Sequence, residues 1–235
     1  MKKHILIVAE PSTLPGVSVD INNYMRFFES DIGGAWDSSE ITVLSNEPKS
    51  KILACVDILR RMRLDYFIMI FGGHGCWSRQ NILQVNSSGE KIPEESFIGV
   101  AERQLSIFDT CRGISSRITM DSLLAEAAGY TRKSRQEIRY RYDDRTMQAI
   151  EQQCKLYACQ IGQSASDDER GGFYSRNLIG SSSMILPGEF VTVPAAHFKA
   201  KERTEKETNG RQSPQITQPR CLEQHSLIFA LSNIF

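Results

Sequence analysis

The sequence has no hydrophobic run long enough to cross a membrane and no excess of charge of either sign. Its N-terminal apolar stretch, residues 5–9, is followed at once by Glu10 and Pro11, whereas a membrane span needs about 18 apolar residues. We therefore interpret this stretch as a first strand rather than a signal peptide, and expect a cytoplasmic protein with no membrane partner. Lys plus Arg and Asp plus Glu number 28 each, so the net charge makes no strong case for a nucleic-acid partner.

Paired cysteine motifs and a glycine-rich phosphate loop are also missing. None of the six cysteines is spaced as CxxC, and a chain of 235 residues does not need disulfides to stabilise its core. This pattern predicts reduced thiols and no metal site. Residues 11–16, after the first predicted strand, are a poor substitute for a phosphate-binding loop, which argues against a flavodoxin-like nucleotide-binding protein. The cysteines are Cys55, Cys76, Cys111, Cys154, Cys159 and Cys221.

Short apolar runs alternate with amphipathic segments through the first half of the chain. In the segment 20–28, Ile21, Tyr24, Met25 and Phe28 fall on one helical face. Strands separated by helices predict an α/β fold with a mainly parallel central sheet flanked by helices, in a single domain over 1–235. The predicted strands are 5–9, 40–44, 65–71 and 105–108, and the predicted helices are 20–28 and 50–62.

The pattern is weaker beyond residue 113. The charged segment 199–207 is predicted to be a solvated loop. The other predicted elements here are a helix near 120–128, a helix through Met147 and Ile150, a strand at 156–159 and a helix near 174–179.

One histidine and one cysteine each follow a predicted buried strand. The run 65–71 leads into Gly73-His74-Gly75, and the run 105–108 leads into Asp109-Thr110-Cys111-Arg112-Gly113. If these strands are parallel neighbours, His74 and Cys111 leave the sheet at the same edge, where open α/β sheets place their ligands.

This pair has the chemistry of a cysteine nucleophile and its base. A thiol with a pKa of about 8.5 is mostly protonated at neutral pH, so it needs a base or a positive neighbour. His74 supplies the base, and Arg112 is a candidate for the positive neighbour. The amides of Gly75 and Cys111 are candidates for an oxyanion hole, worth roughly 3 to 4 kcal/mol of transition-state stabilisation. The sequence shows no Asn or Asp as a third member.

Each residue alone has a simpler interpretation. A lone histidine in a glycine-rich turn is usually a turn residue, and a lone cysteine after a strand is usually a small hydrophobic residue. It is their joint placement at one sheet edge that favours catalysis. Cys76 lies two residues after His74, but it does not end a second strand.

These motifs resemble the caspase-like cysteine peptidases, the group of caspases, metacaspases and small bacterial caspase-like proteins. The caspase signature carries Gln-Ala before the cysteine, whereas Asp109-Thr110 stands here and resembles metacaspases and bacterial relatives. Further similar stretches are 14–20, 163–175 and 212–215. The resemblance implies a three-layer caspase-like sandwich with a catalytic region at about 1–113, an Arg-rich insert at about 114–155 and a small-subunit-like region at about 156–235. It also implies peptide substrates, and a regulated effector in bacterial stress or antiviral defence.

The resemblance also suggests the specificity. Caspases carry an Arg near the position of Leu14 that binds an acidic side chain, and this chain has none there. In metacaspases, acidic residues matching Asp20 and Asp109 select Arg or Lys. Two ionised aspartates attract a basic substrate and repel an acidic one, so we expect cleavage after basic residues. Alternatively, Asp20 is a helix N-cap and Asp109 only orients the turn.

An Arg- and Tyr-rich segment at 130–145 allows three interpretations. It is a solvated helix face, a self-cleavage loop, or a regulatory site in which Arg132, Arg135, Arg139 and Arg141 bind a small anionic activator such as a signalling nucleotide. In the alternative function, this segment belongs to a non-catalytic ligand-binding or scaffold module. We expect no resident cofactor. Calcium is not favoured, because the acidic groups 143–144 and 167–169 have ordinary surface explanations. Pairing of two chains into a homodimer is compatible with the sequence.

Overall fold

The computed structural model describes residues 1–113, 134–184 and 189–231. A six-stranded sheet in the order β12-β8-β7-β3-β1-β2 forms its centre. All its neighbours pair in parallel except β12, which runs antiparallel to β8. The strands are β1 (Lys3–Ala9), β2 (Ile41–Ser45), β3 (Leu64–Gly72), β7 (Ala101–Asp109), β8 (Gln152–Tyr157) and β12 (Gln215–Thr217).

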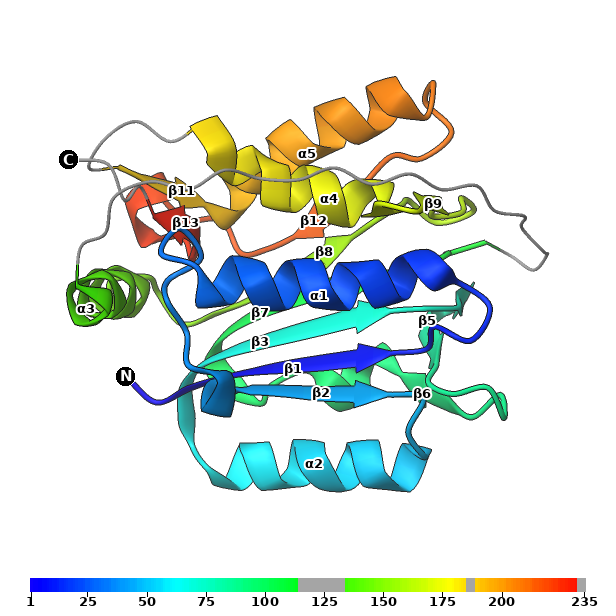
Figure 1. Cartoon of the computed structure of the whole chain (residues 1–235), viewed down its shortest axis with the longest axis horizontal. Helices are drawn as coiled ribbons and strands as arrows, with labels where there is room; N and C mark the ends of the chain where they lie inside the picture. Colours follow the sequence, from blue (N-terminus) through cyan, green and yellow to red (C-terminus); the bar gives the residue numbers. More distant parts are fainter. Residues whose placement is uncertain (114–133, 185–188, 232–235) are drawn as a thin grey trace.

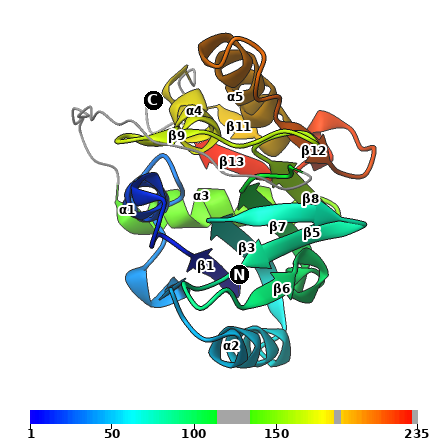
Figure 2. The same cartoon turned by 90° about the vertical axis from the view of Figure 1, so that its right-hand side faces the viewer.

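Helices cover both faces of this sheet. Figures 1 and 2 show α2 below it and α1, α4 and α5 above it. The α-helices are α1 (Pro15–Glu29), α2 (Lys49–Arg61), α3 (Arg135–Met147), α4 (Phe173–Gly180) and α5 (Val193–Glu207); the 3₁₀ helices are η1 (Ser38–Glu40), η2 (Glu94–Phe97), η3 (Ser181–Met184) and η4 (Glu223–His225).

Two hydrophobic cores result, because successive side chains of a strand point to opposite faces. In β3, Tyr66 and Ile68 pack with the core under α1, α3, α4 and α5, whereas Phe67 and Met69 pack with the core over α2.

The predicted α/β class with a mainly parallel, helix-flanked sheet is confirmed. No helix of the described residues is long and apolar enough to span a bilayer.

In the described residues, three small antiparallel sheets accompany the central sheet. The first, β4-β5-β6, occupies a stretch in which the sequence predicted only a polar excursion with a turn near 87–89. The strands of these sheets are β4 (Gly75–Ser78), β5 (Gln80–Gln84), β6 (Lys91–Pro93), β9 (Asp167–Asp168), β10 (Gly171–Gly172), β11 (Phe190–Thr192) and β13 (Ile228–Leu231).

The predicted loop at 199–207 is wrong, because these residues belong to α5. Thr192 caps the helix by accepting the Ala195 amide at 3.3 Å, and Lys201 and Glu205 form an i,i+4 ion pair of 2.6 Å. The predicted helix through Met147 and Ile150 is confirmed as far as Met147, where α3 ends. The predicted helix near 120–128 lies outside the described residues.

Candidate active site

His74 and Cys111 leave the sheet from adjacent parallel strands, as predicted. Gly72 of β3 lies opposite Asp109 of β7 in the register, and each dyad residue follows two positions later. Gly73, which lies between Gly72 and His74 in the sequence, has a φ of +149°, and a Cβ there would come within 3.1 Å of Glu10. This position therefore requires glycine if His74 is to follow β3 directly.

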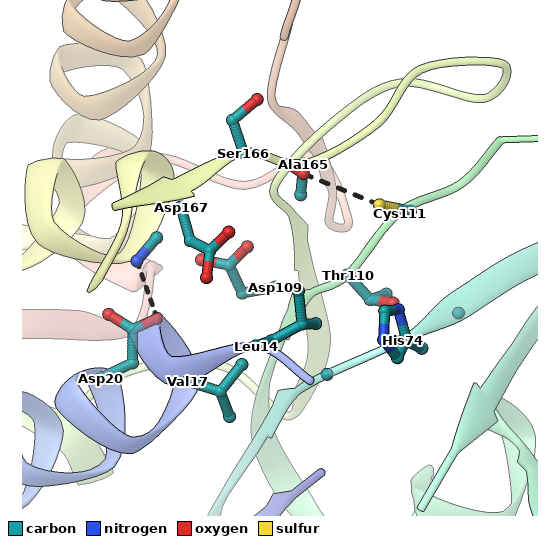
Figure 3. Close-up of a pocket in the computed structure, with 13 residues that line it drawn as sticks. Leu14, Val17, Asp20, His74, Asp109, Thr110, Cys111, Ala165, Ser166 and Asp167 are labelled. Atoms are coloured by element: carbon teal, nitrogen blue, oxygen red, sulfur yellow. Dashed lines mark hydrogen bonds between the residues drawn. The ribbon is translucent and has the colours of Figure 1, made fainter. Parts of the chain in front are cut away.

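The dyad lines one end of an open pocket of about 110 Å³. Figure 3 shows His74 and Cys111 on one side of this pocket and three aspartates on the other. The sulfur of Cys111 donates to the carbonyl oxygen of Ala165 at 3.6 Å. Burial raises the pKa of the Cys111 thiol above its ordinary value, and the bond to Ala165 opposes this only in part. The thiol is therefore protonated in this resting state.

Arg112 does not act as the positive neighbour of the thiol. Its guanidinium donates to Asn81 at 2.9 Å and to Gln215 at 2.8 Å, and it stacks 4.1 Å from the ring centroid of Tyr157. The side chain thus joins β5 and β12 to the loop after β7. Its amide donates to Gln163 at 3.0 Å, which fixes the backbone next to Cys111.

The predicted oxyanion donors, the amides of Gly75 and Cys111, lie beside the His74–Cys111 dyad. Gly75 and Leu83 face each other in the ladder, and the Gln84 amide donates to the His74 carbonyl at 2.9 Å. Gly75 therefore belongs to a pair that exchanges no ladder hydrogen bonds, and its amide points to the open edge of β4. Gly75 and Cys111 both line the pocket.

Asp20 and Asp109, predicted as substrate-binding residues, meet at the other end of the pocket. Asp20 accepts the Gly172 amide at 2.9 Å, and Asp109 accepts the Ser175 amide at 3.2 Å and its hydroxyl at 2.5 Å. A Cβ at Gly172 would lie 2.5 Å from Asp109 Oδ2 and 3.1 Å from Asp20 Oδ2, so this glycine lets both carboxylates approach. The N-cap interpretation of Asp20 is wrong, because α1 begins at Pro15.

Asp167 is a third carboxylate of the pocket, which the sequence interpretation had assigned to the surface. It lies in the wall opposite α1, where its Oδ2 would be 2.5 Å from a Cβ at Gly16. Its one signal in the sequence was its place inside the 163–175 stretch that carried the family resemblance.

Desolvation is the largest effect on the pKa of each of the three carboxylates. Burial, followed by the charge of Asp109, raises the pKa of Asp20 well above its ordinary value. Burial raises the pKa of Asp109 to about 6 and also raises the pKa of Asp167. Asp20 Oδ1 and Asp167 Oδ2 are buried without a hydrogen-bond partner. Two acceptors of this kind are costly unless a donor occupies the pocket.

Two of the stretches that resemble the caspase-like family, 163–175 and 212–215, are hydrogen-bonded to each other and stabilise the pocket wall that contains Asp167. The buried Gln212 donates to the Ala158 carbonyl at 3.0 Å and accepts the Ser166 amide at 3.0 Å. In return, Gln163 accepts the Ser213 amide at 2.7 Å. Residues far apart in the chain thereby hold the 163–167 segment against the dyad.

The described part of the Arg-rich segment lies at the opposite edge of the sheet. Asp143 of α3 pairs with Lys3 at the start of β1 at 2.6 Å. Arg135 donates to the Trp36 carbonyl, and Arg139 binds Glu40 at 2.8 Å and the Ala35 carbonyl at 2.8 Å. Arg141 is also in α3, and Arg132 lies outside the described residues. The structure thus does not bring Arg135, Arg139 or Arg141 to the dyad.

In the described ranges, no group of three or more His, Cys, Asp or Glu side chains is arranged to hold a metal ion. Of the acidic groups weighed for calcium, Asp143 pairs with Lys3, and Asp168 pairs with Arg176 at 2.6 Å.

The fold is similar to that of solved caspase structures. Caspase-1 from Spodoptera frugiperda superposes with a TM-score of 0.60 at 11% identity, over 92% of this chain and 86% of that one. A protein from Geobacter sulfurreducens superposes with a TM-score of 0.59 at 12% identity, over 97% of both chains. At these identities the likeness shows a caspase-like fold and nothing finer. No protein-family model matches the sequence, and no curated protein matches it.

Proposed function

We propose that this protein is a cysteine endopeptidase that cleaves after Arg or Lys, with Cys111 as nucleophile and His74 as general base and acid. The observation that carries the proposal is one pocket with a thiol and an imidazole at one end and three carboxylates at the other. A caspase-like fold is consistent with this reaction class but does not establish it.

In the proposed reaction, the proton of Cys111 passes to His74, and the thiolate attacks the carbonyl carbon of the scissile bond. The amides of Gly75 and Cys111 stabilise the oxyanion. Collapse of this intermediate breaks the C–N bond, and His74 returns the proton to the leaving amine. Water then hydrolyses the thioester and regenerates the thiol.

A basic side chain fits the acidic end of the pocket. Its aliphatic stem would lie against Leu14 and Val17, which line the pocket next to Asp20. Its head would donate to the unpartnered oxygens of Asp20 and Asp167. An acidic side chain would instead meet three carboxylates, so it should be rejected.

The protonated thiol supports a regulated enzyme within the same proposal. Because burial raises the pKa of Cys111, catalysis needs an event that moves the thiol from the Ala165 carbonyl toward His74. A bound substrate or a small anionic activator would supply such an event. In the cell, we propose that this regulated enzyme acts as an effector in bacterial stress or antiviral defence.

The test is hydrolysis of fluorogenic peptides that end in Arg, Lys or Asp, by the wild-type protein, Cys111→Ala and Cys76→Ala. We expect Arg and Lys peptides to be cut, Asp peptides to be spared, Cys111→Ala to be inactive and Cys76→Ala to retain activity. Parallel reactions with calcium or signalling nucleotides would identify an activator. Faster cleavage after Asp, or full activity in Cys111→Ala, would overturn the proposal. A folded protein that is silent in every reaction would favour the non-catalytic module.

A further inference from the structure

The imidazole of His74 has a hydroxyl partner from another element. Thr13, in the turn between β1 and α1, places its Oγ1 2.6 Å from His74 Nε2. In the part of the chain that the structure describes, the other ring nitrogen, Nδ1, has no hydrogen-bond partner. Nδ1 is therefore the nitrogen available to the thiol.

The turn that carries Thr13 is attached to the strand end that carries His74. The buried Glu10 accepts the Ser12 amide at 3.0 Å, and its own amide donates to the Gly72 carbonyl at 2.9 Å. The Leu14 amide donates to Pro11 at 3.2 Å and closes the turn. Thr13 and His74 are thus fixed relative to each other through one buried residue.

We propose that Thr13 is a positioning residue, the orienting partner of the dyad that the sequence does not reveal. Resting on the proposed function, the inference is that the Thr13 hydroxyl accepts the Nε2–H of His74 and so leaves Nδ1 unprotonated. The Cys111 proton then moves to Nδ1, and the imidazolium keeps its Nε2–H bond to Thr13. A base whose tautomer is fixed in this way does not populate the Nδ1–H tautomer, which cannot accept the thiol proton at Nδ1.

A neutral acceptor suits the charge of this pocket. A carboxylate in this position would add a fourth negative group to Asp20, Asp109 and Asp167. Asp167 already interacts electrostatically with His74, since the imidazole lowers the pKa of Asp167 against the larger effect of burial. Asp167 thus supplies stabilising charge for an imidazolium, and Thr13 supplies only orientation.

The experiment compares Thr13→Val, which keeps the shape but removes the hydroxyl, with Thr13→Ser, which restores it. Ser12→Ala is the matched control, because it removes an exposed hydroxyl from the same turn. The first readout is the tautomer of His74 from ¹⁵N NMR shifts, measured well above the range in which histidines titrate. We expect the Nε2–H form in the wild type, Thr13→Ser and Ser12→Ala, and a mixture of tautomers in Thr13→Val.

The second readout is the kinetics with an Arg peptide. We expect kcat to fall about tenfold or more in Thr13→Val with KM little changed, and to recover in Thr13→Ser. A pure Nε2–H tautomer in a folded Thr13→Val would overturn the inference whatever the activity, and so would a wild-type kcat in that variant. A wild-type protein that cuts no peptide but shows the expected tautomers would overturn the proposed function and leave the Thr13 assignment standing.

Discussion

The aspartates of the pocket differ in how completely their oxygens are hydrogen-bonded. Asp109 accepts two bonds from Ser175 on one oxygen, whereas Asp20 Oδ1 and Asp167 Oδ2 accept none. Bonded oxygens hold the pocket in shape, and unbonded ones are available to a ligand. Asp20 and Asp167 are thus the carboxylates that can still accept a hydrogen bond from a cationic side chain.

We predict that Asp167→Asn lowers kcat/KM for Arg peptides. A charge-assisted hydrogen bond to a partly desolvated carboxylate contributes about 1.5 to 3 kcal/mol, which corresponds to roughly a 10- to 100-fold loss in kcat/KM. Glu169→Gln is the matched control, because it removes one negative charge from the β9–β10 turn outside the pocket. Equal effects of the two substitutions would mean that only long-range charge matters at this position.

At the scale of elements, the active site depends on the close approach of β4 to the end of β7. A Cβ at Gly75 would come within 2.3 Å of Thr110 Oγ1 and 3.2 Å of the Ile82 carbonyl. Thr110 Oγ1 is itself buried and has no hydrogen-bond partner. The lack of a Cβ at Gly75 therefore allows the close spacing between β4, which carries the proposed oxyanion donor, and the end of β7, which the proposed nucleophile follows.

We predict that Gly75→Ala destabilises the fold by about 1 to 3 kcal/mol, as overpacked core substitutions do. It should also reduce kcat, because the amide at this position is a proposed oxyanion donor. Thr110→Ala removes the nearest clashing atom, so the double variant should recover part of the stability lost in Gly75→Ala. Denaturant unfolding of the four proteins measures this coupling. If the two changes in the free energy of unfolding are strictly additive, the side chains at positions 75 and 110 do not interact.

Which elements the sequence predicts depends on how their hydrophobic residues are arranged. β1 and β3 consist mainly of apolar residues because both faces of a parallel sheet are buried, and the sequence predicts both strands. Only the second half of β7, near the shorter run 105–108, is predicted, and the two dyad residues follow β3 and β7. α5 was missed because its buried face consists mainly of small or polar residues, among them Ala196, Ala200 and Thr204. A helix of this composition shows no apolar stripe.

The candidate site divides in the same way. His74, Cys111 and Asp109 follow strands, so their placement comes from the sheet register, which the sequence predicts. Thr13 lies in a turn and Asp167 in a two-residue strand, and their positions depend on tertiary contacts: the Glu10 amide donates to the Gly72 carbonyl, and Gln212 accepts the Ser166 amide. No local pattern predicts such contacts.

At the scale of the whole molecule, the pocket costs stability when its carboxylates are ionised. Asp20 is buried and Asp109 is half-buried between α1 and β10, next to a sheet with hydrophobic cores on its two faces. An ionised carboxylate in such a place is poorly solvated, so folding favours its neutral form. Substrate binding would offset this cost, as is common in sites built for a charged ligand.

We predict that Asp109→Asn stabilises the protein at high pH and much less at low pH. The pKa of Asp109 is raised from 3.8 to about 6 in the folded state, so between these values the folded protein binds more protons than the unfolded chain. Its contribution to stability is therefore fully present below the unfolded pKa and is lost as pH rises through about 6. Asparagine does not titrate, so the advantage of Asp109→Asn should grow by at most about 3 kcal/mol from acidic to alkaline pH.

Urea unfolding of wild type and variant across this range tests the prediction. Asp168→Asn is the control, and its effect on the free energy of unfolding should change with pH in the opposite direction, because Arg170 and Arg176 hold the pKa of Asp168 below its ordinary value despite its burial. A difference between Asp109→Asn and wild type that is constant with pH would show that folding does not shift the pKa of Asp109.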